Sequence, residues 1–153
     1  SYGKLHFKKN RTTFRMEYGV TGNINATPDR IWKLLIDADN YTKWNSTLTS
    51  LEGEIALGGT VRMKVPEAPG RTCKVKITEY TPGKSMLWAD GFAPVFQGRR
   101  TFTLEPNDDG TTCFKMSEVF KGLMLPLIAG KLPDFGPIFE RYALDLKNAA
   151  EKL

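Results

Sequence analysis

The sequence predicts one α+β domain, in which a curved antiparallel sheet of about seven strands packs against a long C-terminal helix. Between residues 46 and 120, turn-forming residues recur at the short spacing of a strand meander, for example at Gly58-Gly59 and Pro82-Gly83. From about Asp134 to Leu153, apolar residues follow a helical spacing instead. The chain has 153 residues, of which 41% are hydrophobic, and is therefore long enough for one well-buried core.

The elements before the meander follow from local patterns. Apolar and polar residues alternate from Phe14 to Ile24, which predicts a half-buried strand. Thr27 is a good helix N-cap, and Pro28 suits the first helical position, so a helix should begin here. We expect a second short helix to carry Tyr41 and Trp44.

The first two strands after the helices alternate in the same way. Apolar residues from 61 to 65 and from 73 to 77 are interleaved with Arg and Lys, so one face of the sheet should be apolar and the other wet. Continuing the pairing across the Pro82-Gly83 turn places Ile77 beside Trp88.

The basic charge is concentrated at the start of the chain. Five of the 22 Lys and Arg residues lie within residues 1–15, which hold no acid, so the rest of the chain has 17 basic and 17 acidic residues. We therefore expect residues 1–13 to be a basic, solvated tail, and residues 14–153 to form the domain. A neutral domain gives no reason to expect a specific nucleic-acid partner.

Few residues are available for metal or triad chemistry. The only histidine, His6, lies in the expected tail, so the folded body lacks the residues for a His-rich zinc site or a Ser-His-Asp triad. Cys73 and Cys113 should be unpaired, because two other strands lie between the strands that carry them. No apolar run reaches the length of a membrane-spanning helix, and we expect a cytoplasmic protein without a cofactor.

Three strands between Lys84 and Phe120 place charged residues on an apolar face. Side chains alternate along a strand, so the even-numbered residues share one surface. The predicted register puts Trp88 opposite Phe102, and Asp90 opposite Arg100, with Glu118 next to Arg100 on the third strand. Two carboxylates would then flank one guanidinium. This row has three interpretations: a structural ion network, a polar anchor for a ligand, or an acid–base pair in which burial raises a carboxyl pKa.

Two apolar segments lie near the end of these strands. Residues 92–96 form an exposed aromatic connection between two strands, and residues 123–132 are apolar but interrupted by glycine and proline. They form either a small hydrophobic cluster or a movable lid at the mouth of a pocket.

The order of these elements and several residue runs resemble the START-like superfamily, also called SRPBCC, which includes polyketide cyclases, lipid-transfer domains and plant pathogenesis-related allergens. The resemblance covers about residues 16–153. The runs that carry it are Ile24 to Asp37, Tyr41, Trp44-Asn45, Glu52-Gly53, Gly58-Gly59, Glu118 to Gly122, and Asp145 to Lys147 with Glu151. The resemblance implies the helix-grip fold, with a ligand cavity between the sheet and the long helix, but no catalytic residue by motif.

The residues and the resemblance together predict a protein that binds a hydrophobic or amphipathic small molecule, as a monomer or weak dimer. One alternative is a polyketide cyclase or dehydratase-like enzyme that uses Asp90 or Glu118 for proton transfer, with Arg100 steadying an enolate. The other is a protein-interaction module related to Hsp90-activator domains. The predicted ligand-binding residues are Met63, Ile77, Trp88, Asp90, Phe92, Phe96, Arg100, Phe102, Met116, Glu118, Phe120, Phe139 and Tyr142.

Overall fold

A computed structural model describes residues 5–152 of the chain. In this part, eight strands form one curved antiparallel sheet in the order β1-β2-β8-β7-β6-β5-β4-β3. The strands are β1 (His6–Arg11), β2 (Arg15–Ile24), β3 (Ser50–Gly53), β4 (Thr60–Lys64), β5 (Cys73–Thr81), β6 (Ser85–Phe92), β7 (Phe96–Pro106) and β8 (Thr112–Lys121). The α-helices are α1 (Pro28–Ile36), α2 (Tyr41–Trp44), α3 (Leu125–Ile128) and α4 (Phe135–Glu151). The predicted fold class is confirmed, with one strand more than expected.

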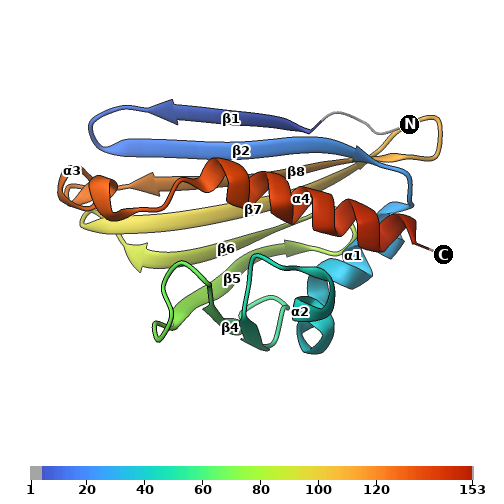
Figure 1. Cartoon of the computed structure of the whole chain (residues 1–153), viewed down its shortest axis with the longest axis horizontal. Helices are drawn as coiled ribbons and strands as arrows, with labels where there is room; N and C mark the ends of the chain where they lie inside the picture. The colour runs from blue at the N-terminus through green and yellow to red at the C-terminus, as the bar shows by residue number, and fades with distance from the viewer. Residues whose placement is uncertain (1–4, 153) are drawn as a thin grey trace.

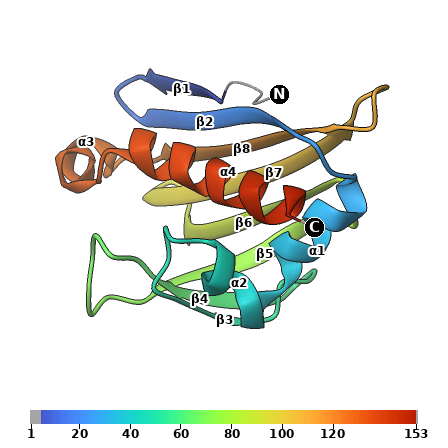
Figure 2. The ribbon, with the colours of Figure 1, turned by 45° about the vertical axis from the view of Figure 1, so that its right-hand side comes forward.

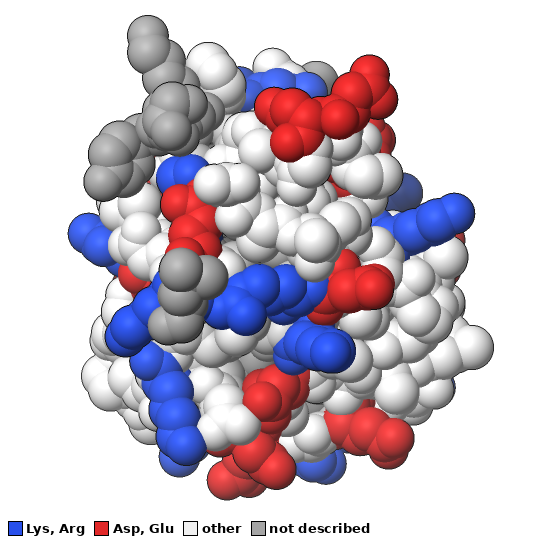
Figure 3. All heavy atoms as spheres, turned by 90° about the vertical axis from the view of Figure 1, so that its right-hand side faces the viewer, with Lys and Arg blue, Asp and Glu red and all other residues white. Residues whose placement is uncertain are grey.

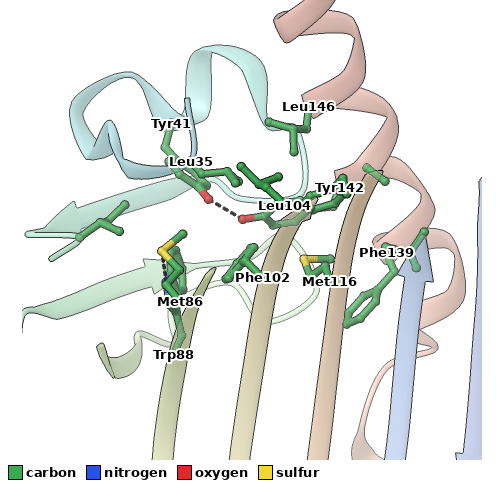
Figure 4. Packing of buried hydrophobic residues seen from close by; sticks show 14 of the residues in the cluster. Leu35, Tyr41, Met86, Trp88, Phe102, Leu104, Met116, Phe139, Tyr142 and Leu146 are labelled. Carbon is green, nitrogen blue, oxygen red and sulfur yellow. Dashed lines mark hydrogen bonds between the residues drawn. The ribbon is translucent and has the colours of Figure 1, made fainter. Parts of the chain in front are cut away.

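Helix α4 lies across one face of the sheet (Figure 1). Its buried stripe includes Phe139, Tyr142 and Leu146, which repeat at the three- and four-residue spacing of one helical face. Figure 4 shows these side chains on the side of α4 that faces the strands carrying Phe102 and Met116. The core is therefore the layer between α4 and the sheet, as the sequence indicated.

Side-chain caps mark the starts of α1 and α4, and the cap of α1 is the predicted one. The side chain of Thr27 accepts a hydrogen bond from the backbone N–H of Arg30, and Pro28 is the first residue of α1. At α4, the Asp134 side chain caps the first turn by accepting from the N–H of Gly136. Helices α1 and α2 both contact α4, and α2 also contacts strand β3 (Figure 2).

The basic segment expected to be a tail forms strand β1 from His6 to Arg11, so that expectation is wrong for these residues; residues 1–4 lie outside the described part of the chain. The strand pairs with β2, and the Phe7 ring approaches the rings of Tyr18 and Phe139 with centroids 6.2 and 6.4 Å away. Phe7 stands among basic and polar residues, and this pattern is too weak to predict a strand. The segment becomes a strand because its backbone forms hydrogen bonds with the edge of β2.

Two of the three predicted registers are confirmed. Strands β7 and β8 oppose Arg100 and Glu118. Strands β5 and β6 oppose Ile77 and Trp88 as predicted, although an irregularity between Ile77 and Glu79 shifts their pairing by one residue nearer the turn. The cysteines also lie where the strand order places them. Both are unpaired, with Cys73 on β5 and Cys113 on β8, so that β6 and β7 stand between them.

The predicted register between β6 and β7 is wrong by two residues. Trp88 lies opposite Arg100, and Asp90 lies opposite Gly98. A shift of two residues keeps every side chain on its face, so the alternating pattern is the same in both registers. The short connection at residues 93–95 sets the pairing instead, and that length is not visible in the alternation.

No helix within residues 5–152 is long and apolar enough to cross a bilayer.

Candidate functional site

A cavity of about 470 Å³ lies between the sheet and the region where α4 begins. This volume falls in the range of small-molecule pockets. Seven of the thirteen residues predicted for ligand binding line it: Met63, Trp88, Asp90, Phe96, Arg100, Glu118 and Phe120. They come from β4, β6, β7 and β8, so the cavity depends on the curvature of the whole sheet rather than on one motif.

A buried ion pair closes one side of the cavity. The Nε–H of Arg100 donates to Oε1 of Glu118 at 2.6 Å. The two side chains are only 16% and 12% exposed. A charge-assisted hydrogen bond of this kind, shielded from water, holds both groups in place and gives the cavity a polar wall.

Asp90 lies next to this pair without bonding to Arg100. Its Oδ1 accepts a hydrogen bond from the backbone N–H of Gly98, at 3.1 Å. A methyl group on Gly98 would lie 2.5 Å from that oxygen and 3.4 Å from Oε2 of Glu118. The absent side chain of Gly98 therefore makes the space in which the two carboxylates approach each other.

Aromatic rings support the guanidinium from the helix side. The Cζ atom of Arg100 lies 5.1 Å from the Phe139 ring centroid and 5.7 Å from that of Tyr142. The Tyr142 hydroxyl is 2.6 Å from the hydroxyl of Tyr41, drawn as a dashed line in Figure 4. These cation–π contacts help to orient Arg100 against α4.

The acids of the site are shifted towards their neutral forms. Burial raises the pKa of Glu118, and the neighbouring Asp90 adds to the shift, while Arg100 opposes it. Burial also raises the pKa of Asp90, against the hydrogen bond from Gly98 and the charge of Arg100. Burial lowers the pKa of Arg100, but the charge and hydrogen bond of Glu118, together with Tyr142 and Tyr41, outweigh it, so the pKa of Arg100 lies above its ordinary value. The cluster of Asp90, Arg100 and Glu118 thus combines two carboxylates with raised pKa values and one permanent cation, and the charge of Arg71 also opposes the shift at Asp90.

The tyrosine pair titrates outside the physiological range. Burial raises the pKa of Tyr142 to about 12, although the charge of Arg100 lowers it. Burial and the neighbouring Tyr142 hold the pKa of Tyr41 well above its ordinary value. Both hydroxyls are therefore neutral hydrogen-bonding groups.

The other six predicted residues do not line the cavity. Five are in the packed core, where the rings of Trp88 and Phe102, for example, lie 4.9 Å apart. The sequence could not distinguish a core position from a cavity position on the same face. The five core residues are Ile77, Phe102, Met116, Phe139 and Tyr142. Phe92, the sixth, is 67% exposed at the end of β6.

Several lining residues were not predicted. Val75 and Cys73 were recognised only as part of an apolar strand face, and Phe135 and Leu132 only as parts of the last helix and the apolar segment. Arg71 and Glu67 come from a connection without any signal for a site. The lining residues not predicted as ligand-binding are Leu48, Val65, Glu67, Ala68, Arg71, Cys73, Val75, Gly98, Lys131, Leu132, Pro133 and Phe135.

The apolar segment after β8 is tied to the β6–β7 connection. The backbone N–H groups of Leu123 and Met124 donate to the carbonyls of Pro94 and Val95, at 2.9 and 3.0 Å. The next residue, Leu125, is fully buried. The two segments therefore form one wall near the cavity. Within residues 5–152, no group of three His, Cys, Asp or Glu side chains is arranged to hold a metal ion.

Solved structures with the same fold come from proteins of different kinds. The truncated norcoclaurine synthase from Thalictrum flavum has a TM-score of 0.68 at 16% identity and covers 94% of this chain and 99% of its own. A START superfamily protein from Mycobacterium smegmatis has a TM-score of 0.63 at 16% identity, with 88% and 97% covered. The Aha1 dimer from Colwellia psychrerythraea has a TM-score of 0.66 at 20% identity, with 88% and 96% covered. At these identities the likeness shows a common fold.

No curated protein matches the chain in sequence. The model of the family described as polyketide cyclase / dehydrase and lipid transport matches residues 15–151, which is nearly the whole chain. This match agrees with the sheet, the long helix and the cavity between them, and it confirms the START-like resemblance of the sequence. The chain belongs to the polyketide cyclase / dehydrase and lipid transport family.

Proposed function

We propose that the protein binds one hydrophobic or amphipathic small molecule in the cavity beside the Arg100–Glu118 pair. The observation that carries the proposal is a cavity of about 470 Å³ with a largely apolar lining and one charged wall. Small-molecule pockets combine these two properties, since apolar walls supply affinity and a few polar groups fix the orientation. The apolar body of the ligand would contact Trp88, Phe96 and Phe120, and its polar end would face the carboxylates.

The charged wall favours the interpretation of the cavity as a ligand site rather than as a packing defect. Burying charged groups beside empty apolar space is costly, and a core without function gains nothing from it. The open hydrogen-bonding positions of Asp90 and Glu118 accept hydrogen bonds, and in their neutral forms they also donate them. A hydroxylated or amine-bearing aromatic molecule therefore fits the wall better than a pure hydrocarbon.

A pair of neighbouring residues on β5 provides a binding test. Val75 lines the cavity, whereas Lys74 is exposed on the other face of the strand. The probe is 1-anilinonaphthalene-8-sulfonate, whose fluorescence increases in an apolar site. Val75→Trp should reduce the affinity for this probe at least about tenfold by filling the cavity, while Lys74→Trp should leave it unchanged. Equal affinities in the two variants, with both folded, would contradict the proposal.

The two cysteines give an independent readout of the same site. Cys73 lines the cavity, and Cys113 lies on β8 outside it; both are partly exposed. Saturation with the probe should slow alkylation of Cys73 by N-ethylmaleimide and leave the rate at Cys113 unchanged, measured by peptide mass spectrometry. Equal protection of both thiols would indicate general stabilisation of the fold rather than occupation of the cavity.

The raised pKa values favour a second candidate function, which is proton transfer on a bound carbonyl compound. Glu118, with its raised pKa, is a better base than a solvated carboxylate, and Arg100 stands beside it to stabilise an enolate. The base removes a proton from the carbon next to the carbonyl, the electron pair moves to the carbonyl oxygen, and the same proton or a solvent proton returns.

This second function has a direct test with phenylacetone in heavy water. The wild-type protein should accelerate deuterium incorporation next to the carbonyl, followed by NMR, and Glu118→Gln should abolish the acceleration while still binding 1-anilinonaphthalene-8-sulfonate. Probe binding without any acceleration by the wild-type protein would support a carrier and count against the enzyme.

A further inference from the structure

Exposed apolar side chains gather at the end of the sheet where β6 ends and β7 begins. Three connections meet there: the β1–β2 turn, the β6–β7 connection and the segment after β8, which contains α3 (Figures 1 and 2). Leu127, Phe92 and Leu123 are 70%, 67% and 62% exposed. We call this surface the apolar tip, and it consists of Phe14, Phe92, Val95, Leu123, Met124 and Leu127.

Backbone hydrogen bonds join the three connections into one surface. The N–H of Gly122 donates to the carbonyl of Phe14 at 3.0 Å, and the bonds to Pro94 and Val95 described above tie the same segment to the β6–β7 connection. Gly122 permits this approach, since a methyl group there would lie 2.3 Å from the carbonyl oxygen of Val95. The apolar side chains are thus held outward by an ordered backbone.

The exposure of the tip is not a consequence of poor packing. Leu125, in the middle of the same segment, is fully buried, and Phe96 stacks on Phe120 with ring centroids 6.0 Å apart. The inner side of the tip therefore already has its partners. An outward apolar cluster on such a base is typical of a surface that meets something apolar.

The three connections that form the tip carry basic side chains only, one of which, Arg15, pairs with Glu17 on β2 at 3.5 Å. Residues 11–15, 92–97 and 121–132 contain four basic residues and no aspartate or glutamate. The four, all exposed, are Arg11, Arg15, Lys121 and Lys131. The opposite end of the molecule differs, because red and blue side chains are mixed there (Figure 3) and the β7–β8 connection carries Asp108 and Asp109.

We propose that the apolar tip docks on the surface of a bilayer that contains anionic lipids. Apolar side chains of this kind enter the boundary between headgroups and acyl chains, while surrounding lysines and arginines are attracted to the negative headgroups. The absence of acids from all three connections suits a uniformly negative surface better than a protein partner of mixed charge. This docking does not require that the cavity hold a ligand.

The position of the tip gives the docking a consequence for the cavity. Lys131 and Leu132 line the cavity and belong to the same segment as the tip. A protein docked by the tip therefore holds this side of the cavity next to the lipid surface. An apolar ligand could pass between bilayer and cavity with little exposure to water.

The test uses vesicles of phosphatidylcholine and equimolar vesicles of phosphatidylcholine and phosphatidylglycerol, with binding measured by co-sedimentation. The wild-type protein should bind the anionic vesicles and bind the neutral ones far more weakly. Replacing both tip leucines (Leu123→Ser with Leu127→Ser) should lower the partition coefficient at least about tenfold. Leu57→Ser is the matched control, because Leu57 is 66% exposed on the β3–β4 connection, and it should bind as the wild type does.

A second pair of variants tests the charge. Replacing Lys121 and Lys131 together by Gln should weaken binding and reduce its dependence on salt, whereas the same change at Lys74 and Lys76, on the wet face of β5, should have a smaller effect. The cavity-filling variant Val75→Trp should bind vesicles normally. Vesicle binding tests the docking proposal and probe binding tests the proposed ligand site, so either proposal can fail without the other.

Three results would overturn the docking proposal. The first is no binding of the wild-type protein to anionic vesicles. The second is equal binding by the leucine-to-serine variant, which would mean adsorption by charge without insertion. The third is self-association of the wild-type protein in sedimentation velocity, abolished by the same serine variant, without vesicle binding; the tip would then be an interface between copies of the chain.

Discussion

Arg100 and Glu118 form the charged contact on which the polar wall of the cavity depends. Each is the direct cross-strand neighbour of the other, and the rings of Phe139 and Tyr142 cover the guanidinium. Removing one member of such a pair leaves the other buried without compensation, which costs more than the pair itself contributes.

Arg100→Met should therefore destabilise the protein by about 3–5 kcal/mol near pH 8 and by much less near pH 5. Without the cation, Glu118 and Asp90 bind protons more tightly in the folded chain than in the unfolded chain, whose carboxyl pKa is about 4. Stability is then lost as the pH rises from that value through the raised folded-state pKa. Urea unfolding at the two pH values measures the difference.

The neighbouring arginine is the control for this prediction. Arg99 lies on the other face of β7, 42% exposed, and its nitrogen is 3.7 Å from a carboxylate oxygen of Glu79. Arg99→Met should cost less than about 1 kcal/mol at either pH. Equal costs for the two arginine variants would mean that the Arg100 charge has no special role in stability.

Gly98 is the second residue with a defined role, because it leaves room for Asp90. Gly98→Ala should destabilise the protein by about 1 kcal/mol, since the new methyl group displaces the Asp90 carboxylate from its hydrogen bond with the Gly98 N–H and presses on Phe120. In an Asp90→Ala background the same change should cost clearly less. Chemical denaturation of the four proteins in this cycle gives the coupling between the two positions.

Gly19 provides the comparison for Gly98. It also lies within a strand, but a methyl group there would have its nearest neighbour at 3.7 Å, an ordinary contact. Gly19→Ala should be neutral or slightly stabilising. If both glycine variants were destabilised equally, the cause would be a general loss of strand flexibility and not the contact with Asp90.

At the scale of elements, β1 shows how a weak pattern becomes a strand through its neighbour. Five of its six residues are basic or polar and exposed, but the backbone of β2 pairs with β1 along all six residues. The Phe7 ring then fills a gap between Tyr18 and the start of α4.

Phe7→Ala should accordingly lower the free energy of unfolding by about 1–3 kcal/mol, less than a fully buried phenylalanine because the residue is partly exposed. Lys8→Ala, on the exposed face of the same strand, should change it by less than about 0.5 kcal/mol. Thermal or urea unfolding compares the two. No loss of stability in Phe7→Ala would show that β1 contributes little to the fold in solution.

At the scale of the whole molecule, the sheet order keeps the two cysteines apart. Cys73 and Cys113 lie three strand spacings from each other, or about 14 Å at about 4.8 Å per strand, whereas a disulfide needs α-carbons within about 7 Å. Thiol titration of the protein, unfolded without reductant, should find two free thiols. Finding none in a monomeric sample would contradict the strand order.

Much of the architecture could be predicted because it depends on local chemistry. The alternation of β2, β4, β5 and β8, the Thr27 cap and the apolar stripe of α4 are each set by neighbours within a few residues. The face that carries Arg100 and Glu118 followed from the same alternation. Their pairing followed as well, because the β7–β8 register was predicted correctly.

The remaining features depend on contacts between segments far apart in the chain. A two-residue shift between β6 and β7 leaves every side chain on the same face of the sheet. The alternation therefore cannot show that Asp90 lies opposite Gly98 rather than Arg100, and the length of the β6–β7 connection decides it. Whether an inward side chain lines a cavity or fills the core depends on where the sheet curves away from α4, which separates Phe120 from Phe102 although both are inward and apolar. The basic segment from His6 to Arg11 likewise forms a strand because its backbone pairs with β2. The residue pattern thus specifies which face each side chain takes, and the packing of distant segments specifies what it meets there.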